Sequence, residues 1–223
     1  MAGIRLLEHV PPATIKELEK ACAWRHYAAN EQIIDRQSDT REVFFVIEGR
    51  VRIAIYSIQG REITLDDLTP GDHFGELAAI DAEPRSASVT AITSCHLASL
   101  SADRFMALCA SEPDVSFRLM RSLSHIVRMA TDRIMDLSTL AANNRVHAEI
   151  LRQAKLNMSD DNRAEISPIP VHSDIASRVS TTRETVARVM NDLAREGLVE
   201  RQKKVLVVQD VERLEDMVED VRG

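Results

Sequence analysis

The stretch that most constrains this chain of 223 residues is 114–142, because no glycine or proline interrupts it. A stretch of this length predicts one long helix, and Pro113 stands where a helix commonly begins. Apolar residues recur along it at the a and d positions of three heptads. The predicted seam consists of Met120, Leu123, Val127, Ala130, Ile134, Leu137 and Ala141. The helix could pack on its own domain. We favour a parallel homodimer, because the small Ala130 and Ala141 would let two helices come close.

The residues before this helix have the texture of short strands. Between residues 31 and 100, segments rich in β-branched and aromatic residues are punctuated by Gly49, Gly60 and Gly71, roughly ten residues apart. The segment "RVRIAIYSIQG" alternates polar and apolar residues, which is the period of a half-buried strand. Such regular punctuation predicts a β-sandwich or jelly roll. Ahead of it, Pro12–Tyr27 is predicted to be a helix that packs on the sheet.

Composition excludes several classes of protein. Hydrophobic residues make up 44% of the chain, enough for a packed core, and the net charge of -7 does not favour nucleic-acid binding over the whole surface. No apolar run is long enough to span a membrane, and no secretory signal is expected. The scattered Cys22, Cys95 and Cys109 indicate reduced thiols in a cytoplasm and argue against an iron–sulfur or structural zinc site. We expect no metal and, without a nucleophile–base set, no enzyme.

The stretch "SDIASRVSTTRETVARVMNDLAREG" has the layout of a helix-turn-helix. Ser173 is expected to cap the first helix and Thr182 the second. The buried stripe of the second helix would be Val186, Val189, Met190 and Leu193. A recognition helix presents its N-terminal end to base edges in the major groove, where Arg can read guanine and Glu can accept from cytosine. The candidate DNA-binding residues are Ser173, Thr181, Thr182, Arg183, Glu184, Thr185, Arg188 and Lys203.

The next stretch, "GLVERQKKVLVV", predicts two strands joined by a basic turn, which is the wing of a winged helix. Its cations would meet DNA phosphates. Residues 171–208 hold seven Lys or Arg against five Asp or Glu, so this segment carries +2 within a chain of -7. A helical hairpin with a charged solvent face is the alternative interpretation, and the wing favours DNA binding.

A third motif is "FGELAAIDAEPRSAS", Phe74 to Ser88, which we call the cassette. It sets a Gly-Glu pair nine residues before an Arg-Ser pair. Glu76 and Arg85 could form an ordinary surface ion pair, or they could be the two ends of a cradle for a ligand.

These motifs together resemble the cyclic-AMP receptor protein (CRP/FNR) superfamily of bacterial transcription regulators, over about residues 10–208. The resemblance implies that Arg85 pairs with the exocyclic oxygens of a cyclic phosphate and that Glu76 accepts from the ribose 2′-hydroxyl. It also implies that Arg183, Glu184 and Arg188 recognise a half-site resembling GTGA within a palindrome. The implied ligand-binding residues are Phe74, Gly75, Glu76, Leu77, Arg85, Ser86, Ala87, Ala130 and Thr131.

The cassette departs from the family pattern in ways that bear on the effector. Its spacing and Pro84 are more similar to the cassettes of cyclic-nucleotide-dependent kinases and channels. Ala130 and Thr131 fall where the enterobacterial regulator has Thr-Ser against the adenine, and Ala130 cannot hydrogen-bond a base. Ser86 could meet a guanine 2-amino group. Cyclic AMP is favoured, with cyclic GMP or another effector left open.

The combined prediction is an α+β chain of three parts. Residues 1–113 form a β-sandwich sensor that binds cyclic nucleotide, 114–142 a dimerisation helix, and 143–223 a winged helix-turn-helix. The expected function is allosteric transcription regulation in the cytoplasm. The expected partners are double-stranded palindromic DNA, a second copy of the chain and RNA polymerase, with no membrane. The alternative from another class is a cyclic-nucleotide-binding regulatory subunit that acts through protein contact.

Overall fold

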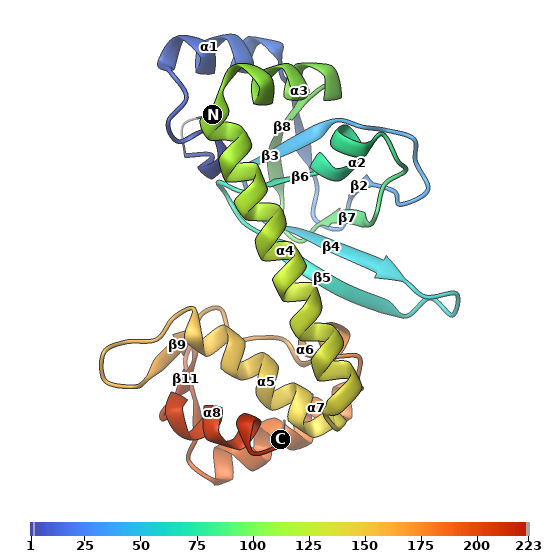
Figure 1. Ribbon diagram of the computed structural model, residues 1–223. Helices are drawn as coiled ribbons and strands as arrows, with labels where there is room; N and C mark the ends of the chain where they lie inside the picture. The colour runs from blue at the N-terminus through green and yellow to red at the C-terminus, as the bar shows by residue number, and fades with distance from the viewer. Residues whose placement is uncertain (2, 222–223) are drawn as a thin grey trace. The chain divides into compact units, whose positions relative to one another are not determined.

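The computed structural model describes residue 1 and residues 3–221 (Figure 1). The chain divides into two compact units, residues 1–126 and 127–223. The predicted mixture of helix and sheet is confirmed, with antiparallel strands in the first unit and a helix-turn-helix in the second.

The first unit is built on two antiparallel sheets, with strand orders β1-β8-β3-β6 and β2-β7-β4-β5. Short helices lie before, between and after the strands (Figure 1). In chain order the elements are the 3-10 helix η1 (Arg5–Leu7), α1 (Pro12–Ala21), β1 (Ala23–Tyr27), β2 (Gln32–Ile34), β3 (Val43–Glu48), β4 (Val51–Tyr56), β5 (Glu62–Leu68), β6 (His73–Phe74), α2 (Glu76–Asp81), β7 (Ser88–Ala91), β8 (Cys95–Leu100) and α3 (Ala102–Ser111).

Strand β3 shows why the central strands are apolar throughout. Successive side chains of a strand point to opposite faces. Val43 and Phe45 belong to the core that also contains residues of η1, α1 and α3, whereas Phe44 and Val46 belong to the core that contains residues of both sheets. Because both faces of β3 are covered, the strand carries no polar alternation.

The helix predicted over Pro12–Tyr27 is wrong in its second half. Helix α1 ends at Ala21, and Cys22 takes an extended backbone with φ -77° and ψ 144°. Residues 23–27 form β1, which pairs with β8 and places His26 opposite His96, the two rings stacked 4.1 Å apart. Only the last residue of β1 is buried, so the strand lacks an apolar alternation that the sequence could reveal.

Helix α4 (Pro113–Thr139) is the predicted long helix, and it begins in the first unit and ends in the second. The prediction of helix up to Ala142 is wrong at its end, because α4 stops at Thr139 and Ala141 is the extended residue that precedes α5. Ala141 therefore lies outside the helix that carries the predicted seam. Most of that seam is open in the single chain, with Val127 and Ile134 more than 60% exposed, whereas Leu123 packs against the core of the first unit.

The second unit packs helices around one core, beside an antiparallel sheet with strand order β10-β11-β9. Helices α6 and α7 are the predicted helix-turn-helix, and β10 and β11 are the predicted wing, with Val199 opposite Val208. The elements after α4 are α5 (Ala142–Lys155), β9 (Ala164–Ile166), α6 (His172–Arg178), α7 (Arg183–Arg195), β10 (Val199–Gln202), β11 (Val205–Val208) and α8 (Val211–Glu219).

No helix among the described residues combines the length and the apolar character that crossing a membrane requires. Within the same residues, no three His, Cys, Asp or Glu side chains gather as they would around a metal ion.

Candidate functional site

The cassette begins where strand β6 turns into helix α2, and the turn depends on Gly75. Its φ of 85° lies in the left-handed region that side chains disfavour. A Cβ at this position would lie 2.7 Å from Arg85 Nη1 and 2.8 Å from the Glu42 carbonyl oxygen. Only glycine therefore allows the backbone to come this close to the arginine.

Arg85 is buried, with 4% of its surface exposed, and its guanidinium is held by three protein acceptors. Nη1 donates to the Gly75 carbonyl at 2.9 Å, Nη2 to the Glu42 carbonyl at 2.9 Å, and Nε to the Thr40 hydroxyl at 3.1 Å. The Glu42 carboxylate lies 3.5 Å from Nη2 and remains half exposed. Burial lowers the pKa of Arg85, and the negative charges of Glu42 and Glu76 oppose this shift. Protein contacts alone thus hold this cation in a buried position.

Glu76 is the first residue of α2 and is buried, with 7% exposure, so the cassette does not present a surface ion pair. Within the described residues the ion pair of Arg85 is with Glu42, and Glu76 acts on it at longer range. The nearby His73 is half-buried, and desolvation lowers its pKa while Glu76 and Asp72 oppose this.

The other cassette residues fall into two groups. Phe74 packs in the core, where its ring stacks on Phe44 at 5.0 Å, and Ala87 is buried as well. Leu77 and Ser86 are exposed. Of these predicted ligand-binding residues, Gly75 lies directly against the guanidinium of Arg85, whereas the Phe74 side chain supports the fold.

Ala130 and Thr131 are exposed residues of α4, in the part of the helix that belongs to the second unit. The Thr131 hydroxyl donates to the Val127 carbonyl at 3.0 Å, one turn back along the same helix. Their contact with a base stays a prediction.

The second candidate surface is the N-terminal end of α7. Thr182 caps the helix as predicted, since its hydroxyl accepts from the Thr185 amide at 3.2 Å. The cap leaves Arg183 and Glu184 exposed in the first turn. The pKa of Glu184 lies below its usual value, because its own backbone amide and Thr182 hydrogen-bond the carboxylate and Arg183 lies close. Both side chains are thus exposed to solvent at the N-terminal end of α7.

The remaining predicted DNA-binding residues lie on α6, before and along α7, and at the β10–β11 turn. Arg188 is exposed one turn further along α7, and Val186, Val189 and Leu193 form the buried stripe. Lys203 stands at the β10–β11 turn with a positive φ of 38°. The prediction that Ser173 caps the first helix is wrong, because α6 begins at His172 after Val171. The backbone between residues 168 and 171 enters the helix two residues earlier than the sequence suggested.

Two residues of α5 escaped the sequence analysis. Arg145 donates to the carbonyls of Leu140, Val179 and Ser180, at 2.8, 2.9 and 3.2 Å. Asn143 accepts from Arg188 Nη2 at 3.1 Å. No local pattern signals these contacts, because they join positions more than thirty residues apart or across the end of a helix.

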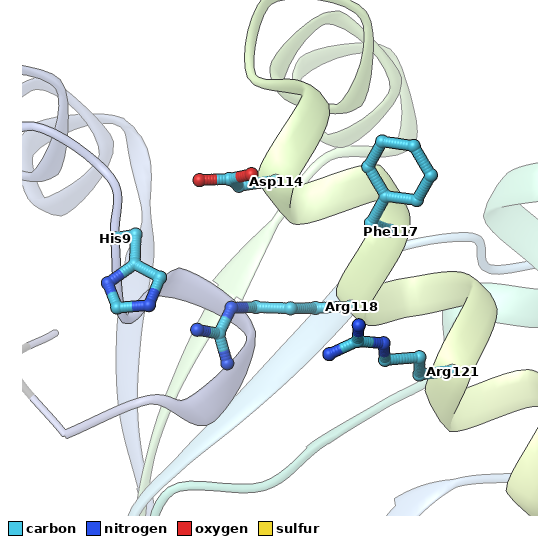
Figure 2. Close-up of a pocket in the computed structure, with 5 residues that line it drawn as sticks. All are labelled: His9, Asp114, Phe117, Arg118 and Arg121. Atoms are coloured by element: carbon cyan, nitrogen blue, oxygen red, sulfur yellow. The ribbon is translucent and has the colours of Figure 1, made fainter.

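A hollow of about 420 Å³ lies elsewhere in the first unit and is lined by His9, Asp114, Phe117, Arg118 and Arg121 (Figure 2). In the figure the guanidinium of Arg118 extends toward His9. Arg118 is already paired with Glu8 at 2.8 Å, and Asp114 stands on the rim, so the positive charge is largely offset. This hollow shares no residue with the cassette, and we assign no ligand to it.

Two family models match the chain. The model described as the cyclic nucleotide-binding domain matches residues 24–112, which include the cassette, and the model described as the Crp-like helix-turn-helix domain matches residues 144–217. The chain is also 30% identical over 213 residues to the cAMP-activated global transcriptional regulator Vfr of Pseudomonas aeruginosa, covering 91% of this chain and 97% of that one. A CRP-like cAMP-activated global transcriptional regulator of Mycobacterium tuberculosis is 26% identical over 215 residues, 96% of each chain.

Solved structures are also similar to this chain in fold. A CooA mutant from Carboxydothermus hydrogenoformans aligns with a TM-score of 0.80 at 21% identity, over 91% of this chain and 90% of the other, which shows the fold. The Thermus thermophilus catabolite activator protein aligns with a TM-score of 0.55 at 28% identity, over 97% and 99%. The matching relatives are transcription regulators, not enzymes. With a cyclic nucleotide-binding domain and a helix-turn-helix in one chain, and relatives matched over nearly their whole length, this protein belongs to the CRP/FNR family of transcription regulators.

Proposed function

We propose that this regulator is switched by cyclic AMP and that, as a homodimer, it binds a palindromic DNA site with GTGA-like half-sites. The observation that carries the effector part is the buried guanidinium of Arg85 beside Gly75. The names of the relatives support the same effector, since those of both P. aeruginosa and M. tuberculosis are described as cAMP-activated.

The chemistry of the cassette suits a cyclic phosphate. Arg85 has five N–H donors, and its three protein bonds leave one on each terminal nitrogen. Two exocyclic oxygens of a phosphate are the matching pair of acceptors. The half-exposed Glu42 carboxylate, 3.5 Å from Nη2, is the anion that such a phosphate would displace. Glu76 supplies the acceptor for a ribose hydroxyl, and Gly75, Ser86 and Ala87 supply small residues around the phosphate.

The base is the open part of this proposal. Thr131 retains a hydroxyl for a base edge, and Ala130 does not. Ser86 is exposed beside the cassette arginine and has a hydroxyl that a guanine amino group could meet. We propose cyclic AMP as the effector, with cyclic GMP as the second candidate. The third is a different effector, as other regulators of the family could sense.

On the DNA side, Arg183, Glu184 and Arg188 would recognise base edges. The DNA backbone or the edge of the site would be contacted by Ser173, Thr181, Thr185 and Lys203.

The exposed apolar residues of α4, such as Val127 and Ile134, would be covered by the same helix of a second copy. A palindrome needs two recognition helices about 34 Å apart, and a two-fold dimer supplies them. In this proposal residues 1–113 are the sensor, 114–142 the dimerisation segment and 143–223 the DNA-binding part. The regulator acts on cytoplasmic DNA together with RNA polymerase.

The switch itself is a population shift. Ligand bound at the cassette and at Ala130 and Thr131 would favour one arrangement of the α4 pair, and that arrangement would set the recognition helices for DNA. A ligand shifts such an equilibrium only by its difference in affinity for the two states.

Calorimetry of the purified protein against cyclic AMP and cyclic GMP in parallel tests the effector. The proposal expects saturable binding of cyclic AMP that is tighter than that of cyclic GMP. Tighter binding of cyclic GMP would make cyclic GMP the effector. If neither nucleotide gives heat of binding, the proposal that the cassette binds a cyclic nucleotide is wrong.

A further inference from the structure

Arg188 differs from the other two predicted base-reading residues in how its side chain is held. Its Nη2 donates to Asn143 Oδ1 at 3.1 Å, so the recognition helix α7 is joined to the first turn of α5. Within the described residues, neither Arg183 nor Glu184 is hydrogen-bonded to a side chain of another helix. Of the two arginines on the recognition surface, Arg188 is thus held by a side chain of another helix and Arg183 is not.

The turn that carries Asn143 is itself fixed to the helix-turn-helix. Arg145, two residues further on, donates to the carbonyls of Val179 and Ser180, which end α6 and form the turn before α7. Its third bond, to the Leu140 carbonyl, holds the segment between α4 and α5. Asn143 is therefore placed by backbone contacts that Arg188 does not provide, and it can act as a fixed support.

We infer that Asn143 is a positioning residue for DNA specificity, which orients the guanidinium of Arg188 toward its base. The inference rests on the proposed DNA recognition by Arg188. The amide oxygen is a neutral acceptor and occupies one of the five N–H donors, so at least a bidentate pair remains for guanine O6 and N7. A side chain that is already held in place loses less conformational entropy when it binds.

The alternative role for Asn143 is a direct contact between its amide N–H and a DNA phosphate. A phosphate contact would weaken binding to every sequence by the same factor, because phosphates carry no sequence information. A positioning role weakens discrimination at one base pair, the one that Arg188 reads. The two roles therefore differ in a measurable way.

The test uses the full-length protein at saturating cyclic AMP and fluorescent duplexes that carry the GTGA-like palindrome, each base pair of the half-site being replaced in turn. We expect Asn143→Ala to lower discrimination about two- to tenfold at the base pair where Arg188→Ala lowers it, and not at the one where Arg183→Ala does. In the Asn143→Ala, Arg188→Ala double variant, the asparagine change should add nothing. The matched control is Asn144→Ala, the same change at the next position, which is expected to leave discrimination unchanged.

Asn143→Asp keeps an acceptor for the guanidinium, so discrimination should be retained. Overall affinity for DNA should fall, because the added negative charge repels the phosphates. The inference is overturned if Asn143→Ala leaves discrimination intact, lowers affinity equally on random DNA, or adds fully to Arg188→Ala. If instead Arg183→Ala and Arg188→Ala both leave the palindrome preference of the wild type unchanged, or if the wild type has no such preference, the proposed DNA recognition itself fails.

Discussion

Arg85 in the cassette and Arg183 on the recognition helix are both expected to meet an anionic or polar ligand, yet the fold holds them in opposite ways. Arg85 is buried and donates to two carbonyls and a hydroxyl, whereas Arg183 is exposed and ordered mainly through the backbone of a capped helix. Removing a buried cation is costly, because its buried acceptors lose their hydrogen-bond donor. Removing an exposed cation is not, because water replaces it. Arg85 therefore supports the fold and, in our proposal, would also bind the ligand, whereas Arg183 would serve DNA binding alone.

Arg85→Ala is the change with the largest expected effect. Removal of the guanidinium leaves buried acceptors without a donor, so we expect the free energy of unfolding to fall by about 2–4 kcal/mol and cyclic-nucleotide binding to be abolished. Urea unfolding and calorimetry measure the two effects. Arg85→Lys, which keeps the charge but not the fork, should recover part of the stability and little of the binding. Full stability and unchanged ligand affinity in Arg85→Ala would contradict the double role of Arg85 in the fold and in ligand binding.

Gly75→Ala is next, because it strains the backbone and collides with the same arginine. With a φ of 85° and a Cβ only 2.7 Å from Arg85 Nη1, the variant should lose about 2–3 kcal/mol of stability and bind ligand more weakly. The matched control is Gly60→Ala, where φ is 76° and no atom lies within 4 Å of the added Cβ. This control should lose only about 1–2 kcal/mol, from backbone strain alone, with ligand affinity retained. Equal ligand affinity in the two variants would argue against the close approach at Gly75.

Arg183→Ala should leave stability unchanged within about 0.5 kcal/mol, because the side chain is exposed. We expect it to lose about 1–3 kcal/mol of discrimination at one guanine of the half-site. Fluorescence anisotropy with consensus and base-substituted duplexes provides the measurement. An equal loss on random DNA would instead identify a phosphate contact.

Lys203→Ala has the smallest expected effect and extends the comparison to the wing. Because Lys203 is exposed at the β10–β11 turn, a phosphate contact there should weaken binding to all sequences alike and lower the salt dependence of the affinity by about one unit in the log–log slope. Affinities over a range of salt concentrations test this. A change in base preference would contradict a backbone role.

The sequence was informative where a local pattern determines structure. The uninterrupted stretch after Pro113 predicted α4, and Thr182 predicted the start of α7, because a cap and a helical period are local. The end of α4 was misplaced, since no glycine or proline marks the break at Leu140 and Ala141, where the Leu140 carbonyl accepts from Arg145 of the next helix. Strand β1 was missed, because pairing with β8 and not its own pattern makes it a strand.

The candidate site shows the same limit. The cassette motif identified Glu76 and Arg85, but their burial and the contacts of Arg85 with Thr40 and Glu42 depend on loops more than forty residues away. The support of Arg188 by Asn143 likewise joins two helices that are forty-five positions apart. Tertiary contacts of polar side chains leave no period in the sequence, so only the folded chain reveals them.

In the proposed function, the buried cassette controls the exposed recognition surface. The most direct test is the affinity for the GTGA-like palindrome measured while cyclic AMP is titrated, for the wild type and for Arg85→Lys. We expect saturating cyclic AMP to tighten DNA binding by the wild type about 5- to 150-fold, the usual range of allosteric coupling, and Arg85→Lys to lose most of this gain. DNA affinity that stays the same at saturating ligand would contradict it.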